Sequence, residues 1–419
     1  MSQLQDASLT ETRNIENGKW DATYELKAVL LLSMGFGLVG VDRFLIMPLF
    51  PFIMKSLHFG YQELGAITGA LSLGWGVAAI FMGNLCDRIG HRHVVIPALL
   101  LFSLLAGLSG VATGAIGLIL IRILMGFLEG SYTPSSIVAT IDASKPSRHG
   151  RNVGLQQALN PLFGLALVPI LVTHLLAFMS WRYIFAIVSA PGLIVAFLLW
   201  KYLRDTPPEV AALHTKTQDA AHHGWFEIFK YHNIPLNIIG MLCWLTCLIV
   251  LTAFLPNYLM DYLHFSTAQM GYIFSGIGIG STLGTFVIPI ISDHIGRKPM
   301  MILSVIGAFI FLVLLAHVTT SAGLLFLYLI CTLFFIFGMI VLTVGPICVE
   351  SAPATLMTSA SGIVIGIGEL FGGFLAPVLG GYVASRFGIQ HIFDLGFAAL
   401  IIGLISSICL TETLIGKRK

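Results

Sequence analysis

Two opposite charges, Asp42 and Arg43, stand side by side in the middle of an apolar stretch. The stretch runs from residue 28 to residue 54 and is long enough to cross a bilayer as a helix. An ionisable side chain at that depth costs about 2.5 kcal/mol or more to insert, so we expect it to have a function. Adjacent residues on a helix point about 100° apart, so one side chain should face a neighbouring helix and the other a cavity. A structural pair that neutralises itself is the alternative.

A second pair of charges lies in another apolar stretch, where Glu129 follows Arg122 by seven residues. Seven residues are two helical turns, so both side chains share one face, which should meet protein or water and not lipid. Binding of an anion at an arginine can change how readily a nearby acid takes up a proton. The two pairs together therefore predict proton-coupled transport. A pair that only ties helices together is the alternative.

The composition is that of a membrane protein. Of the 419 residues, 57% are hydrophobic and only 10% are charged, too few polar groups to cover a soluble protein of this size. Twelve apolar segments can be marked, at roughly 28–54, 62–86, 94–113, 114–141, 153–177, 181–203, 234–262, 266–292, 299–318, 321–349, 355–385 and 389–413. The sequence therefore predicts an all-α membrane protein with twelve transmembrane helices in two pseudo-symmetric six-helix bundles.

The longest polar stretch inside the chain separates these two bundles. We expect a cytoplasmic N-terminal tail at 1–27, a first bundle at 28–203, a cytoplasmic linker at 204–233, a second bundle at 234–413 and a cytoplasmic C-terminal tail at 414–419. The first tail lacks the short apolar core and the cleavage site of a signal peptide.

The basic residues indicate the orientation. With both termini in the cytoplasm, only Lys55, Arg182 and Arg386 of the 22 Lys and Arg fall on the outer side, and Arg43 and Arg122 lie within the membrane. This asymmetry follows the positive-inside rule. The sequence therefore predicts a multi-pass protein of the inner or plasma membrane with both termini in the cytoplasm.

A short motif occurs once in each half. Residues 83–92 read GNLCDRIGHR and residues 289–298 read PIISDHIGRK, so that Asp87 and Asp293 are 206 positions apart. Each copy has an acid at a helix end, a turn glycine three residues later and then basic residues. Parallel six-helix repeats with a binding site between them are a transporter architecture.

The motif resembles the signature loop of the major facilitator superfamily, G-x-L-a-D-x-x-G-R/H-R/K, and the resemblance covers nearly the whole chain. The second copy departs from the pattern at Pro289, which stands in place of the first glycine. In the family this loop is a gate between the halves, whereas solvated loop charges are the alternative here. The resemblance implies a gating role for Gly83, Asp87, Arg88, Gly90, Arg92, Asp293, Gly296 and Arg297.

The four buried charges also resemble one branch of that family, the anion:cation symporters, which includes sialin and the D-galactonate transporter. The resemblance implies that Asp42 and Glu129 handle the proton, that Arg43 meets a substrate carboxylate, and that Arg122 pairs with the acids. The branch commonly reads N-Y-x-D-R, whereas residues 39–41 of this chain read VGV before the pair. Spinster-type lipid transporters carry a similar Asp-Arg pair and a Glu in the fourth helix, and they remain a rival.

Three further polar residues are candidates for contact with the substrate. Gln157 and Asn160 could face a cavity together from the fifth helix, although helix–helix hydrogen bonding is an equal alternative. Glu369 lies deep in the eleventh helix and could line the cavity. The second half lacks charges at the positions that match Asp42, Arg122 and Glu129, so we expect the first half to carry the coupling.

Other classes of protein fit less well. Residues 160–165 read NPLFGL, a degenerate match to the G-P-x-x-G-G signature of efflux pumps. A catalytic Ser/His/Asp set, a metal site and a phosphate-binding loop are all missing from the sequence pattern, so we expect no enzyme, no metal, no cofactor and no nucleic-acid partner. The sequence predicts a monomeric secondary carrier that moves a small organic anion with protons by alternating access. Proton-driven efflux of drugs or metabolites and lipid transport are the alternatives.

Overall fold

Long apolar helices make up nearly all of the computed structural model, which describes residues 15–16, 19–205, 227–318, 320–353 and 356–414. The side chains of residues 15–16, 19, 83–88 and 358–359 also lie outside the described part. Within it, twelve helices are long and apolar enough to cross a membrane, as the sequence predicts. A two-residue antiparallel pair, β1 (Ile15–Glu16) and β2 (Lys19–Trp20), precedes the first of them.

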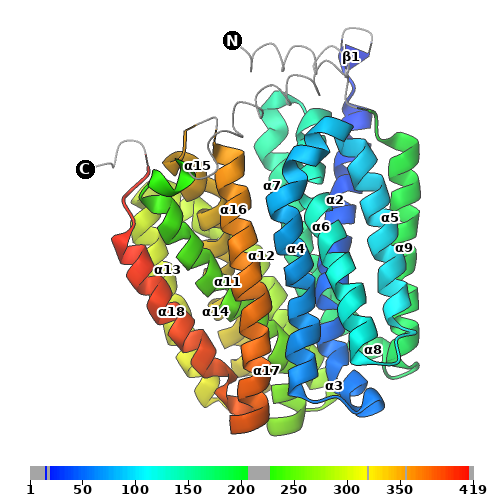
Figure 1. Cartoon of the computed structure of the whole chain (residues 1–419), viewed down its shortest axis with the longest axis vertical. Coiled ribbons are helices and arrows are strands. Elements are labelled where there is room, and N and C mark those ends of the chain that lie inside the picture. Colours follow the sequence, from blue (N-terminus) through cyan, green and yellow to red (C-terminus); the bar gives the residue numbers. More distant parts are fainter. Residues whose placement is uncertain (1–14, 17–18, 206–226, 319, 354–355, 415–419) are drawn as a thin grey trace.

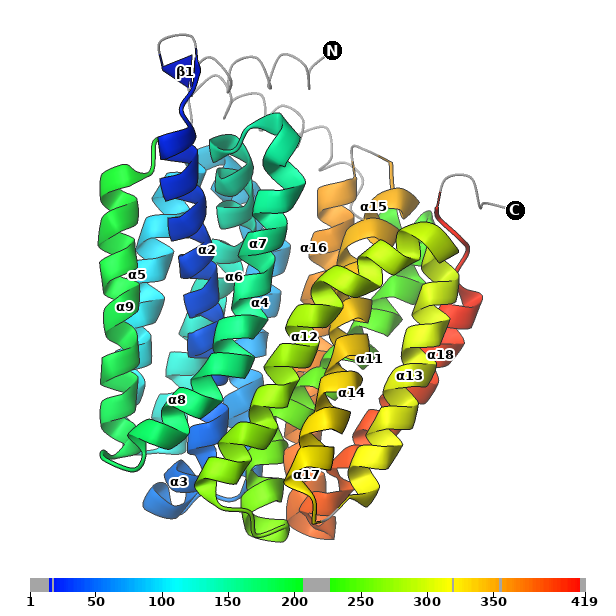
Figure 2. The same cartoon turned by 180° about the vertical axis from the view of Figure 1, so that it is seen from behind.

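The helices form two groups that lie side by side (Figures 1 and 2). The first group contains α2 (Ala22–Phe44), α3 (Ile46–Leu57), α4 (Tyr61–Ile89), α5 (His91–Ser109), α6 (Ala115–Ala143), η1 (Pro146–Arg148), α7 (His149–Pro161), η2 (Leu162–Leu167), α8 (Val168–Leu175) and α9 (Trp181–Tyr202). The second contains α11 (Asn233–Asn257), η4 (Tyr258–Tyr262), α12 (Thr267–Ile295), α13 (Arg297–His317), α14 (Ala322–Leu342), η5 (Thr343–Ile347), α15 (Cys348–Ser351), α16 (Met357–Gly368), η6 (Glu369–Leu375), α17 (Ala376–Phe387), η7 (Ile389–His391) and α18 (Ile392–Cys409).

The outermost helix ends differ from the sequence prediction. The first helix begins at Ala22 and not at residue 28, because Asp21 caps it by accepting a hydrogen bond from the backbone N–H of Tyr24. The last helix ends at Cys409 and not at residue 413. Beyond it, the backbone N–H and the hydroxyl of Thr411 bind the side chain of Asn233.

The first membrane span is broken directly after the charge pair. The helix α2 ends at Phe44, a turn follows at Leu45, and α3 then begins. Pro48 and Pro51 lie in the next two turns, and a proline lacks the N–H that would bind the carbonyl four residues earlier. The charges therefore stand in the last turn of a helix, where carbonyl groups are open to other donors.

The internal repeat is visible in the element boundaries. The helices α4 and α12 begin and end 206 positions apart, as do the starts of α5 and α13. Gly90 and Gly296 connect these helices with φ angles of 87° and 109°, a backbone conformation that glycine adopts without a steric penalty. The turn glycine of each motif copy is thus required by the backbone.

The two groups pack closely near one end of the molecule. We call this end the far face, marked by α3, and the opposite end, where α2 begins and α18 ends, the terminal face (Figure 1). A Cβ atom at Gly65 of α4 would collide with the carbonyl oxygen of Pro377 in α17. On the other side of the junction, a Cβ atom at Gly278 of α12 would collide with the backbone of Ala166 in η2. Glycine therefore lets the backbones of the two halves meet.

Candidate functional site

Five charged side chains meet in the interior, brought together from three spans. Asp42 and Arg43 come from the last turn of α2, Arg122 and Glu129 from α6, and Glu369 from the first residue of η6. Each of the five is at most 8% exposed. We call these residues the charge cluster.

An ion pair between Arg43 and Glu369 joins the two halves of the molecule. The Nη2 atom of Arg43 donates to both carboxylate oxygens of Glu369, at 2.9 and 3.0 Å, and makes a longer contact of 3.3 Å with the hydroxyl of Ser72. Charge-assisted hydrogen bonds of this kind are about twice as strong as neutral ones. The sequence indicates that both residues could face the cavity, but it contains no sign that they bind each other.

The helix α4 supplies two contacts to Arg43 that the sequence analysis missed. The Cζ atom of Arg43 lies over the Trp75 ring, 4.6 Å from the ring centroid. Ser72 accepts the third hydrogen bond of the guanidinium. An aromatic ring face attracts a cation, most strongly when water is excluded. The sequence contained a signal for these contacts, because Ser72 and Trp75 are three residues apart and therefore share one face of a membrane helix.

A small enclosed cavity lies beside the two arginines. Its volume is about 10 Å³, which is enough for roughly one water molecule. It is lined by Arg43, Ile46, Met47, Thr68, Leu71, Ser72, Arg122 and Ile249. Arg43 and Arg122 therefore border one space, and Ile249 of α11 closes it from the second half.

Arg122 binds main chain and not a carboxylate. Its Nη1 atom donates to the carbonyl oxygen of Asp42 at 2.9 Å, and its Nε and Nη2 atoms have no hydrogen-bond partner within the described part of the chain. The sequence analysis expects Arg122 to pair with the acids. In this structure the break after α2 leaves carbonyl groups of its last turn accessible, and the guanidinium binds one of them instead.

Asp42 and Glu129, the two acids that the first half contributes to the cluster, have carboxyl oxygens without a donor in the described part of the chain. Neither carboxyl oxygen of Glu129 nor the Oδ1 atom of Asp42 has a hydrogen-bond partner among the residues that the structure describes. Burying an unpaired charge costs several kcal/mol, and a bound proton removes that charge. The cluster therefore contains two carboxyl groups that are suited to hold a proton.

The amide side chains of the fifth span tie helices together. Asn160 donates to the carbonyl oxygen of Phe36 in α2 at 3.4 Å, and Gln156 donates to the hydroxyl of Ser136 in α6 at 2.8 Å. Gln157 is half-buried. The proposed role of Gln157 and Asn160 in substrate binding remains a prediction.

The first copy of the loop motif is only partly described. Arg92 binds within the first half, to the carboxylate of Asp205 at 2.8 Å and the carbonyl of Trp200 at 2.7 Å. Its gating role remains a prediction. The side chains of Asp87 and Arg88 lie outside the described part, and Gly83 lies in α4.

The second copy of the motif forms a network at the terminal face. Arg297 binds both Asp293 and Glu350, and its backbone N–H donates to Glu412 at 2.9 Å. Burial alone would raise the pKa of Glu412, but four backbone N–H donors outweigh it and lower the pKa below its usual value. The network holds the C-terminal segment against the first turn of α13.

An acid at the terminal face of the first half is stabilised in the same way. The backbone N–H of Tyr24 lowers the pKa of Asp21 below its usual value, burial opposes this effect, and Arg204 adds to it. Arg204 binds the Asp21 carboxylate at 2.7 Å.

Comparisons with known proteins point to one family. A family model described as Major Facilitator Superfamily matches residues 32–370. The chain is 26% identical over 398 residues to the sialic acid transporter NanX of Escherichia coli (strain K12), which covers 90% of this chain and 93% of that protein. It is 24% identical over 278 residues to a hexuronate transporter of Bacillus subtilis (strain 168). This alignment covers 65% of this chain and 66% of the relative.

A solved structure shows the same fold. The D-xylose–proton symporter superposes with a TM-score of 0.77 at 17% sequence identity, over 94% of this chain and 100% of that one. The relatives named here are transporters and not enzymes.

Proposed function

Because the chain belongs to the Major Facilitator Superfamily, we propose that it is a secondary transporter that moves a small organic anion together with protons. The relatives named for sialic acid and hexuronate support a carboxylate as the recognised group. The symporter of similar fold is consistent with coupling to protons.

The observation that carries the proposal is the ion pair between Arg43 and Glu369. The guanidinium of Arg43 already holds a carboxylate, so a carboxylate fits this position in both shape and charge. A substrate carboxylate takes the place of Glu369 at Arg43. Substrate binding and the bond between the two halves are then mutually exclusive.

The charge balance of the cluster supports proton coupling. Three acids and two arginines leave an excess of one negative charge when all five groups are ionised. An incoming carboxylate adds another, in a site where unpaired charge is costly. Protons on Asp42 and Glu129 offset that charge; the Oδ1 atom of Asp42 and both carboxyl oxygens of Glu129 lack donors in the described structure.

The arrangement of the halves supports alternating access. Close backbone contacts join the halves near the far face, and Arg43 and Glu369 join them in the interior. In the proposed cycle, the substrate replaces Glu369 at Arg43 and so breaks the ion pair between the halves. The halves can then open at the far face and close at the terminal face. The terminal face lies in the cytoplasm of a cell whose inner or plasma membrane holds the protein as a monomer, and the two motif loops act as gates there.

A ligand screen tests this function. The purified protein is melted in the presence of organic acids such as sialic acid, hexuronates and aromatic carboxylates, each beside its uncharged amide. A ligand that binds the folded state raises the melting temperature, and the acids but not the amides should do so. A matching acid should then accumulate in proteoliposomes under an inward proton gradient. Equal stabilisation by neutral or cationic compounds would contradict the anion proposal and favour efflux or lipid transport.

A further inference from the structure

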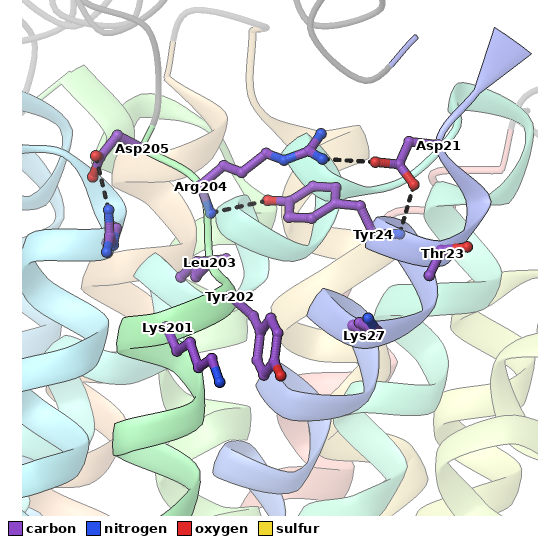
Figure 3. A pocket seen from close by; sticks show the side chains of 10 residues that line it. Asp21, Thr23, Tyr24, Lys27, Lys201, Tyr202, Leu203, Arg204 and Asp205 are labelled. Atoms are coloured by element: carbon purple, nitrogen blue, oxygen red, sulfur yellow. Dashed lines mark hydrogen bonds and ion pairs between the residues drawn. The ribbon is translucent and has the colours of Figure 1, made fainter. Parts of the chain in front are cut away.

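A polar hollow lies on the terminal face of the first half, between the start of α2 and the end of α9 (Figure 3). Its volume is about 650 Å³. We call it the α2–α9 hollow. Its walls include Asp21, Lys27, Arg92, Lys201, Tyr202 and Arg204.

The cations of the hollow outnumber its acids. Asp21 is bound by Arg204 at 2.7 Å, and Asp205 is bound by Arg92 at 2.8 Å, so the two acids are neutralised. Lys27 and Lys201 have no acidic partner within the described part of the chain. Among the residues that the structure describes, two positive charges of the hollow are therefore uncompensated.

A third acid near the hollow is also bound elsewhere. Glu25, on the same turn of α2, accepts hydrogen bonds from Trp20, Arg148 and Asn152. Its charge is directed to η1 and α7 and does not neutralise Lys27.

The ring of Tyr202 lies close to the ammonium groups of both lysines. The Nζ atoms of Lys27 and Lys201 lie 5.3 and 5.4 Å from the centroid of the Tyr202 ring. The ring stands between the two side chains (Figure 3). Attraction to the ring holds both ammonium groups in the wall of the hollow, one on each side of Tyr202.

The hollow lies where the apolar spans end. Trp200 is 59% exposed near the end of α9, and Leu26 is 62% exposed near the start of α2. Exposed aromatic residues at the ends of spans mark the boundary between lipid and water. Further along the same helices, Leu30 and Phe197 are also exposed. An apolar surface therefore continues from the basic hollow into the depth of the membrane.

We propose that the α2–α9 hollow binds the phosphate group of an anionic phospholipid. Lys27 and Lys201 contact the phosphate oxygens, the Tyr202 hydroxyl donates a hydrogen bond, and the acyl chains lie along the exposed side chains of α2 and α9. Lysines at the cytoplasmic membrane surface attract anionic lipids in this way. A soluble phosphate would gain nothing from the apolar surface, so the lipid is the occupant that the whole feature fits.

Native mass spectrometry of the purified full-length protein tests the proposal. Wild type should retain phosphatidylglycerol in preference to phosphatidylcholine, and each lysine should contribute about fivefold to that preference. The double variant Lys27→Gln/Lys201→Gln should lose the preference, and Tyr202→Phe should weaken it less. Lys145→Gln is the matched control, since Lys145 is an exposed lysine before η1 and outside the hollow.

The melting temperature of each variant without added lipid shows whether it is folded. Retention of phosphatidylglycerol by the folded double variant, or an equal loss with Lys145→Gln, would overturn the proposal. Displacement of the lipid by inorganic phosphate at equal concentration would overturn it too, since the site would then bind a soluble anion.

Discussion

The two halves of the chain share one framework and differ in the charge that they bury. The helices α4 and α12 and the glycines after them repeat at a spacing of 206 residues. The first half places four charges of the cluster in its interior, whereas Glu369 is the one that the second half contributes. A repeated framework thus fixes where the spans lie, and single residues decide what chemistry each half performs.

The matching positions make the difference concrete. The counterparts in the other half, 206 positions away, are Leu248 for Asp42, Ile249 for Arg43, Tyr328 for Arg122, Phe335 for Glu129 and Phe163 for Glu369. Each charged residue of the cluster therefore has an uncharged residue at the equivalent position of the other half. An ion pair between the halves requires this asymmetry, because one half must supply the base and the other the acid.

The substitution with the largest expected effect removes the base of that pair. Arg43→Ala leaves Glu369 buried without a partner, which should cost about 3–5 kcal/mol of stability. Anion binding should weaken by roughly tenfold to a hundredfold, because a charge-assisted pair is lost. Arg43→Lys should weaken binding too, since an ammonium lacks the planar geometry of a guanidinium. Thermal unfolding and calorimetric titration measure the two effects.

A double variant separates stability from binding. Arg43→Ala/Glu369→Gln should recover most of the lost stability, because the unpaired acid is gone, and should still bind the anion weakly. Wild-type affinity in either variant would remove Arg43 from the substrate site.

The acids of the first half should govern coupling. Asp42→Asn and Glu129→Gln should each abolish proton-driven accumulation in proteoliposomes and leave exchange of labelled for unlabelled substrate intact. Both variants should fold, because an amide is neutral and similar in size. Undiminished accumulation in both variants would exclude these residues from the proton path. The first half would then have no special role in proton coupling.

The acid of the second half should compete with the substrate. Glu369→Gln removes the carboxylate that occupies Arg43, so the anion should bind about tenfold more tightly, a gain of about 1.4 kcal/mol. Isothermal titration of wild type and variant checks this. Weaker binding in the variant would mean that Glu369 contacts the substrate and does not compete with it.

At the terminal face, one acid in each half should contribute to stability in the same pH-dependent way. The loss of stability on substitution should be smaller than in the cluster. The pKa values of Asp21 and Glu412 are lowered in the folded protein, so their contribution to stability is present above their ordinary values near 3.8 and 4.5. It is lost as the pH falls through the lowered values. Asp21→Asn and Glu412→Gln should each cost about 1 kcal/mol at pH 7 and nothing at sufficiently low pH. Melting curves across pH test both, and a cost that persists in acid would contradict this explanation.

The sequence predicted those features that depend on local pattern. Twelve apolar segments and the repeated motif around Asp87 and Asp293 identified the fold, and the spacing of Arg122 and Glu129 placed them on one helix face. The pairing of Arg43 with Glu369 was not predictable, because the residues are 326 positions apart and lie in different halves. Which face of a helix meets which neighbour depends on tertiary packing.

Other misses had local signals. Asp21 is a favourable N-cap before an apolar helix, and it could have placed the helix start correctly. Pro48 marked the break after the charge pair, from which the carbonyl contact of Arg122 follows. The π-helical winding at Glu369 had no clear signal, since neither composition nor periodicity distinguishes it from an α-helix.

The π-helical stretch that begins at Glu369 makes the eleventh span adjustable in its winding. A π-helical turn holds more residues than an α-helical turn, and the surplus can shift along the chain one residue at a time. Each step rotates the residue at the boundary by about 100°. Glu369 stands at that boundary, so we expect a shift by one residue to turn its carboxylate away from Arg43. Local rewinding of this one helix would then break the ion pair between the halves without a movement of either bundle.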